Sequence, residues 1–110
     1  MNNSSAQPDS LLILIVDDDK FTRLQIRERL QKEGYRVEEM TNGEQCLAAY
    51  TRLHPDIILL DGMMPVMDGF TCCAQLRTLP GGERIALQIY IRTYNWQRKT
   101  SNNTYACSLQ

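Results

Sequence analysis

The stretch LLILIVDDDKFTRLQIRERLQKEGYRV, residues 11–37, holds a strand, a helix and the start of a second strand in direct succession. Its first six residues, 11–16, are continuously aliphatic, which is typical of a strand buried on both faces of a parallel sheet. Residues 20–33 follow a helical pattern, with apolar side chains three and four positions apart. Gly34 tolerates the positive φ of a helix end, and residues 35–37 alternate as a second strand.

The same alternation continues along the chain. It predicts helices at 44–53 and 70–79 and strands at 57–60 and 85–91. Strands that alternate with helices indicate βαβ units with right-handed crossovers, and therefore an α/β, doubly wound parallel sheet with helices on both faces. The helical spacing is seen in the pairs Phe21 and Leu24, and Ile26 and Leu30. It makes Leu47, Tyr50 and Leu53 the apolar anchors of the second helix and assigns Phe70, Cys73 and Leu76 to the inward face of the third.

Length and charge narrow the range of functions. The chain has 110 residues, enough for one domain, and a formal net charge of -1. This charge gives no general attraction for nucleic acid or for an anionic membrane, and no apolar run reaches the roughly 20 residues of a membrane helix. Residues 1–10 are polar and are expected to form a flexible leader rather than a signal peptide. The four cysteines lack zinc-ligand spacing and are expected to be reduced, as in a cytoplasmic protein.

Acidic residues end two of the predicted strands. Asp17, Asp18 and Asp19 follow the first strand, and Asp61 follows the strand at 57–60. If these strands are neighbours, the carboxylates meet in one crevice at the carboxyl edge of the sheet. Converging carboxylates repel one another, and a divalent cation with a preference for oxygen ligands relieves that repulsion. The residues alone therefore favour a Mg²⁺ site that handles phosphate, although acids after a strand also commonly cap the next helix.

Three segments carry a resemblance to a known family. ILIVDDD at 13–19, GYRV at 34–37 and HPDIILLDGMMPVMDG at 54–69 resemble the receiver domain of two-component response regulators, over about residues 11–85. The resemblance implies the flavodoxin-like receiver fold and a role in phosphorelay signal transduction. It further implies a cytoplasmic phospho-acceptor, not a turnover enzyme, that takes its phosphoryl group from a sensor histidine kinase or a phosphotransfer protein.

The resemblance also implies a role for each acid. Asp61 matches the phospho-acceptor, and Asp17 and Asp18 match the acidic pair that binds Mg²⁺ or Mn²⁺. Asp18 is expected to bind the cation directly and Asp17 through water, with the backbone carbonyl of Met63 as a further ligand. Asp19 lies beyond the pair and is expected to cap the first helix.

The last part of the chain departs from the family pattern. The family places a Ser or Thr at the end of the fourth strand, which aligns near Ile91 here, and Thr93, two residues on, could take its place. The family's fifth-strand Lys falls beyond Gln110. Residues 92–110 show no strand or helix period, so we interpret them as an aberrant or disordered tail from a frameshift, a truncation or a chimera, with ordinary divergence as the alternative. The receiver domain then spans 11–91 and lacks its fifth strand and helix, which favours self-association through an exposed edge.

Two other functions remain open. A degenerate receiver could bind partners as an interaction module without switching. The other alternative is a phosphatase of the haloacid dehalogenase type, since Asp17 and Asp19 form an Asp-x-Asp motif after an apolar strand. That motif, however, expects Thr or Val at the position of Phe21.

Overall fold

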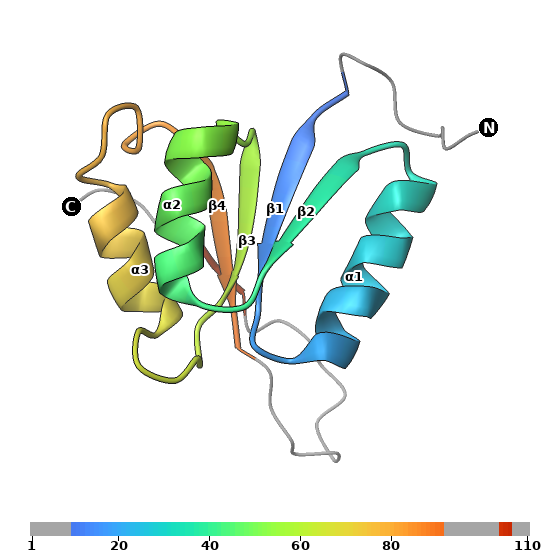
Figure 1. The fold of residues 1–110 in the computed structure, drawn as a ribbon, viewed down its shortest axis with the longest axis horizontal. Helices are drawn as coiled ribbons and strands as arrows, with labels where there is room; N and C mark the ends of the chain where they lie inside the picture. Colours follow the sequence, from blue (N-terminus) through green and yellow to red (C-terminus); the bar gives the residue numbers. More distant parts are fainter. Residues whose placement is uncertain (1–9, 92–103, 107–110) are drawn as a thin grey trace.

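The computed structural model describes residues 10–91 and the short strand at 104–106 (Figure 1). Helices and strands alternate as the sequence predicts, with ends that differ by a few residues. The elements are β1 Leu12–Val16, α1 Lys20–Lys32, β2 Arg36–Met40, α2 Gly43–Leu53, β3 Ile57–Asp61, α3 Gly69–Leu76, β4 Ala86–Tyr90 and β5 Thr104–Ala106.

The strands form one sheet in the order β2-β1-β3-β4-β5. The first four are parallel, and β1 in the interior of the sheet is buried along its whole length. The helix α1 covers one face of the sheet, while α2 and α3 cover the other (Figure 1). This is the strand order of a flavodoxin-like sheet, so the predicted fold class is confirmed for these elements.

The edge of the sheet beyond β4 differs from the prediction. Residues 104–106 pair with β4 in the antiparallel sense, with Ala106 opposite Gln88 and Thr104 opposite Tyr90. The prediction of a tail without strand structure is therefore wrong for these three residues. Three residues are too few to show a periodicity, and it is their hydrogen bonding to β4 that makes them a strand. Thr93, the predicted switch hydroxyl, lies outside the described residues.

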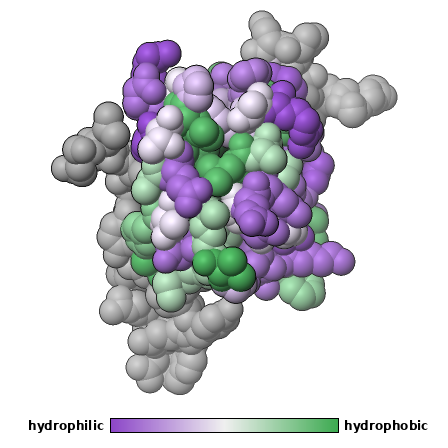
Figure 2. Space-filling model, turned by 60° about the vertical axis from the view of Figure 1, so that its left-hand side comes forward, coloured by the Kyte–Doolittle hydropathy of each residue, from purple (hydrophilic) through white to green (hydrophobic). Residues whose placement is uncertain are grey.

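The hydrophobic core lies between the sheet and the pair α2 and α3. Alternate residues of each strand face this side, and burial of one such aliphatic side chain stabilises the fold by about 1.5–3 kcal/mol. The strands supply Leu14, Val16, Ile58, Leu60, Leu87 and Ile89, and the helices supply Cys46, Ala49, Tyr50, Cys72, Cys73 and Leu76. Outward from this core, polar and apolar side chains are interspersed on the surface of that side (Figure 2).

The helix on the opposite face contributes less to the interior. The helix α1 contains no buried residue, and the side chains of Phe21 and Leu24 are 73% and 46% exposed. Phe70 in α3 is 46% exposed as well. The prediction that Phe70 points inward is therefore wrong, whereas Cys73 and Leu76 of the same helix are buried as predicted. Helical spacing shows which residues share a face, but it does not show whether another element covers that face.

Side-chain caps fix the helix ends next to the loops at the carboxyl edge. The Asp19 carboxylate accepts a hydrogen bond from the Thr22 backbone N–H at 2.9 Å, which confirms its predicted cap. Asn42 and Asp68 cap α2 and α3 in the same way. Each such cap is worth about 1 kcal/mol. These caps hold the first turn of each helix against the loops that carry the acids.

The cysteines follow the prediction only in part. Cys46 and Cys72 are free and buried, whereas Cys73 is disulfide-bonded, so the prediction of a reduced thiol is wrong for Cys73. None of the helices in the described part of the chain is long and apolar enough to cross a membrane.

Candidate functional site

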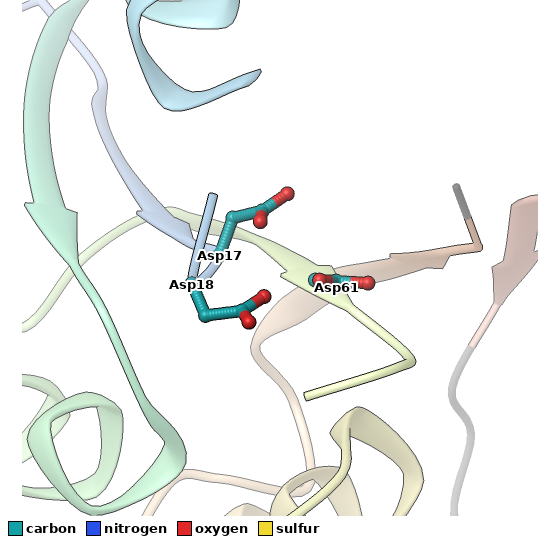
Figure 3. Close-up of side chains that lie close together, drawn as sticks. All are labelled: Asp17, Asp18 and Asp61. Atoms are coloured by element: carbon teal, nitrogen blue, oxygen red, sulfur yellow. The ribbon is translucent and has the colours of Figure 1, made fainter. Parts of the chain in front are cut away.

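Three carboxylates converge at the carboxyl edge of the sheet. The strands β1 and β3 are parallel neighbours, with Val16 opposite Leu60, so the residues that follow these two positions come level with each other. One carboxylate oxygen from each of Asp17, Asp18 and Asp61 lies within 4.8 Å of the others. Figure 3 shows the side chains of Asp17 and Asp18 turned toward the side on which Asp61 lies. The structure thus brings together Asp17, Asp18 and Asp61, the three acids predicted to form the cation and phospho-acceptor site.

Asp17 is wholly buried and is held through both of its carboxylate oxygens. Its Oδ1 accepts the Asp19 backbone N–H at 2.8 Å, and its Oδ2 accepts the Tyr90 hydroxyl at 2.5 Å. The backbone carbonyl of Asp17 accepts a further bond from the Arg23 guanidinium at 2.8 Å. A buried carboxylate needs such donors, because an uncompensated one would shed its charge.

Asp61 is wholly buried too, at the end of β3. The Met63 backbone N–H donates to its Oδ1 at 3.0 Å, and the loop that follows closes when the Gly69 N–H donates to the Gly62 carbonyl at 3.1 Å. The side chain of Met63 is exposed, as expected for a residue that could act only through its backbone. The ligand role of the Met63 carbonyl stays a prediction.

The charges of the three acids define what the crevice can bind. Two carboxylates with no solvent exposure and a third beside them repel one another strongly in a medium of low dielectric constant. The donor set consists of carboxylate oxygens, which suits Mg²⁺ and Mn²⁺ and suits softer transition metals poorly. The residues present therefore fit a hard divalent cation.

A cavity of about 390 Å³ lies beside the exposed acid, Asp18. The loops after β2 and β3 line the rest of it, with Thr41, Asn42, Gly43, Glu44, Pro65, Val66 and Met67. In this loop Val66 has a φ of 70° and a fully exposed side chain. The cavity gives a ligand a route to the acids from the side of Asp18.

Two residues of the site escape the sequence analysis. Tyr90 ends β4 directly opposite Asp61 in the strand register, and its hydroxyl reaches Asp17. The family pattern places a Ser or Thr near Ile91, so it gives no reason to single out a phenol one position earlier. Arg23 lies in the first turns of α1 and joins Asp17 to Glu39 of β2, at 2.9 Å from the Glu39 carboxylate. The i, i+6 spacing from Asp17 carries no familiar motif.

Comparison with protein families gives one match over most of the chain. Residues 13–106 match the model of the response regulator receiver domain, which extends past residue 91, where the sequence analysis ends the domain. Among curated proteins, the response regulator MprA of Mycobacterium leprae is 44% identical over 66 residues, which are 60% of this chain and 29% of MprA. The chain spans about 30% or less of the length of the curated relatives it matches.

Solved structures of receiver domains have a similar fold. The receiver domain of a sensor histidine kinase from Pseudomonas aeruginosa, which holds a magnesium ion coordinated in its active site cleft, is 30% identical with a TM-score of 0.69. The match covers 86% of this chain and 75% of that one. The chemotaxis response regulator CheY4 of Vibrio cholerae is 28% identical with a TM-score of 0.73, over 82% of this chain and 75% of that one.

Proposed function

Because the chain belongs to the response regulator receiver domain family of two-component systems, we propose that it accepts a phosphoryl group on Asp61 in a cation-dependent phosphorelay. The observation that carries the proposal is the convergence of Asp17, Asp18 and Asp61 within 4.8 Å at the carboxyl edge of the sheet. The magnesium ion in the cleft of the related Pseudomonas receiver supports the same use of this crevice.

Each acid has a proposed part in that function. Asp18, the exposed member, binds the cation directly from the side of the cavity, and Asp17 acts through water behind it. Asp61 and the Met63 carbonyl complete the proposed ligand set. Bound there, Mg²⁺ or Mn²⁺ neutralises the charge of the acids and of the incoming phosphoryl oxygens.

Asp61 is the proposed nucleophile. One of its carboxylate oxygens forms a bond to the phosphorus of a phosphohistidine, and the phosphorus–nitrogen bond breaks. The leaving imidazole nitrogen takes up a proton from solvent, and the product is an acyl phosphate on Asp61. Such transfer depends mainly on the position of the reactants and on charge neutralisation, so no general base is needed. The proposed donor is a sensor histidine kinase or a phosphotransfer protein, the partners with which receiver domains work.

A small phosphodonor tests the proposal directly. The chain is incubated with acetyl phosphate or phosphoramidate and Mg²⁺, and its intact mass is measured. We expect a gain of one phosphoryl group in the native chain, none in Asp61→Asn and a normal gain in Asp68→Asn, which replaces an exposed cap by another good capping residue. A folded native chain that gains no mass contradicts the proposal.

A second candidate is an interaction module that binds partners but does not switch. The observation that favours it is Tyr90 at the end of β4, where a phenol reaches Asp17 in place of a small hydroxyl near Asp61. The two candidates differ in the consequences of phosphorylation. In a switching receiver, backbone NMR shifts spread from Asp61 into β4 and its neighbours after phosphorylation. In a module that does not switch, the changes stay within the loops around Asp61.

A further inference from the structure

We propose that Tyr90 is a positioning residue that closes the carboxylate crevice: its hydroxyl holds Asp17 in a hydrogen bond that cation binding must displace, and its ring covers the end of β3. The inference rests on the proposed function where it concerns phosphoryl transfer. Its first measurable consequence is the affinity of the chain for a divalent cation. No motif in the sequence indicates it. It follows from where the sheet places the two residues.

The strand order makes Tyr90 a bridge over Asp61. The strands β1 and β4 are not neighbours, because β3 lies between them. Adjacent strands are about 4.8 Å apart, so a side chain from β4 that reaches an acid at the end of β1 crosses about two strand spacings. Asp61 is the register partner of Tyr90 and ends the strand in between.

The direction of the side chains supports the same arrangement. Val16, Leu60 and Ile89 all belong to the core on the side of α2 and α3. Successive side chains of a strand point to opposite faces, so the next residue of each strand turns to the side of α1. These residues are Asp17, Asp61 and Tyr90. The phenol therefore lies on the same side as both acids, which agrees with the complete burial of Asp61.

The hydroxyl and a cation compete for the same carboxylate. The Oδ1 of Asp17 is engaged by the Asp19 backbone N–H at 2.8 Å, a bond within the turn that leads into α1. The Oδ2 is the oxygen that the Tyr90 hydroxyl holds at 2.5 Å. A cation or its water must draw electron density from this carboxylate, which weakens the bond to a neutral phenol. Cation binding thus includes the work of releasing Tyr90.

The hydroxyl can be removed without the ring. In Tyr90→Phe the ring stays over β3 and the hydrogen bond to Asp17 is lost. We expect Mg²⁺ and Mn²⁺ to bind about tenfold to a hundredfold more tightly than to the native chain, since a hydrogen bond to a charged group is worth about one to two orders of magnitude in a binding constant. Isothermal titration with each metal measures the dissociation constants. A phenol that only braced the sheet would leave them unchanged or weaken them.

Tyr35→Phe is the matched control. Tyr35 is partly buried and directly precedes β2, at the opposite edge of the sheet from the acids. The same loss of a phenolic oxygen there leaves metal affinity at the native value. Tyr90→Ala removes the ring as well, and we expect it to speed phosphorylation by acetyl phosphate beyond Tyr90→Phe, because Asp61 becomes accessible. Equal phosphorylation rates in these two variants contradict the covering role.

A measurement on the native chain needs a variant only to assign one signal. Tyrosine labelled with ¹³C at the ring carbon that bears the oxygen gives one NMR signal per tyrosine, and the signal of Tyr90 is the one lost in Tyr90→Phe. Saturation with Mg²⁺ should shift this signal as the hydroxyl leaves Asp17. A Mg²⁺-saturated chain in which the signal stays at its metal-free position overturns the inference. If Asp61 gains no phosphoryl group while the metal affinities and this signal change as expected, the proposed function fails and the inference about Tyr90 stands.

Discussion

A β-carbon at Gly69 would stand 2.4 Å from the backbone carbonyl oxygen of Asp61, which is closer than real β-carbon contacts come. The same carbon would lie 2.8 Å from the α-carbon of Gly62. Both neighbours are backbone atoms and cannot turn aside. The first turn of α3 therefore rests directly on the residue that bears the proposed phosphoryl group, and only glycine permits this approach.

Gly69→Ala should lower the free energy of unfolding by about 2 kcal/mol, because overpacking against backbone forces the loop after β3 to move. Gly43→Ala is the matched control, since Gly43 is likewise the first residue of a helix. There the added carbon meets the Met67 sulfur at 2.6 Å, the far end of a flexible side chain, so a smaller loss is expected. Urea unfolding of both variants measures the difference. Equal losses would show that the contact with Asp61 has no special cost.

Mg²⁺ should raise the unfolding midpoint of the native chain. A ligand that binds only the folded state at a hundred times its dissociation constant adds about 2.7 kcal/mol. Asp18→Asn removes the exposed ligand and should lose most of this gain. Glu28→Gln removes an exposed acid of α1 and should keep it. Thermal unfolding with and without MgCl₂, at constant ionic strength, compares the three chains. A gain that survives in Asp18→Asn rules out Asp18 as a ligand.

Arg23→Lys should destabilise the chain by about 1–2 kcal/mol, although the charge is kept. The guanidinium donates to the Asp17 carbonyl at 2.8 Å and to the Glu39 carboxylate at 2.9 Å, and one ammonium group cannot reproduce both directions. Arg29→Lys, at an exposed position of the same helix, is expected to be neutral. Chemical unfolding provides the measurement. If the two substitutions have the same effect, the two-way contact of Arg23 has little energetic weight.

Asp68 should give the chain a pH-dependent stability. The Thr71 backbone N–H, and next the Thr71 side chain, hold the pKa of Asp68 below its usual value. The charged form is thus favoured in the folded state, so the contribution is complete above the ordinary pKa of about 3.9 and is lost as the pH falls through the lower folded pKa. Asp68→Ala should cost about 1 kcal/mol near neutral pH, and Asp68→Asn should cost less.

The test for Asp68 is a comparison of urea midpoints between the native chain and Asp68→Asn at about pH 6 and about pH 3. Any advantage of the native chain should shrink in acid, because the asparagine cap does not titrate. If the advantage is the same at both pH values, the negative charge of Asp68 adds nothing to its role as a cap.

Much of the fold could be predicted because its signals are local. The aliphatic run before Asp17 and the one before Asp61 each identify a buried strand without reference to the rest of the chain. Once those two strands are placed as parallel neighbours, the convergence of the acids follows from geometry. The cap at Asp19 follows in the same way from one side chain and the backbone three residues later.

The features that the sequence did not reveal depend on distant partners. Phe70 fits an inward-facing pattern, yet it lies exposed because covering elements are set by the tertiary fold and not by spacing. Tyr90 reaches Asp17 from 73 positions away, and its role depends on a strand order that no local pattern contains. The pairing of residues 104–106 with β4 is likewise a property of the partner strand.

The absence of any buried residue in α1 affects the local opening motions of the molecule. A helix that contributes little to the core opens locally at a smaller free-energy cost than the strands beneath it. Amide hydrogens of α1 should therefore exchange with solvent well before those of β1 and β3. Arg23 of α1 donates to the Asp17 carbonyl, so each opening of α1 also breaks one of the contacts that hold the acidic crevice. The crevice should therefore fluctuate on the timescale of α1 and not on the slower timescale of the sheet.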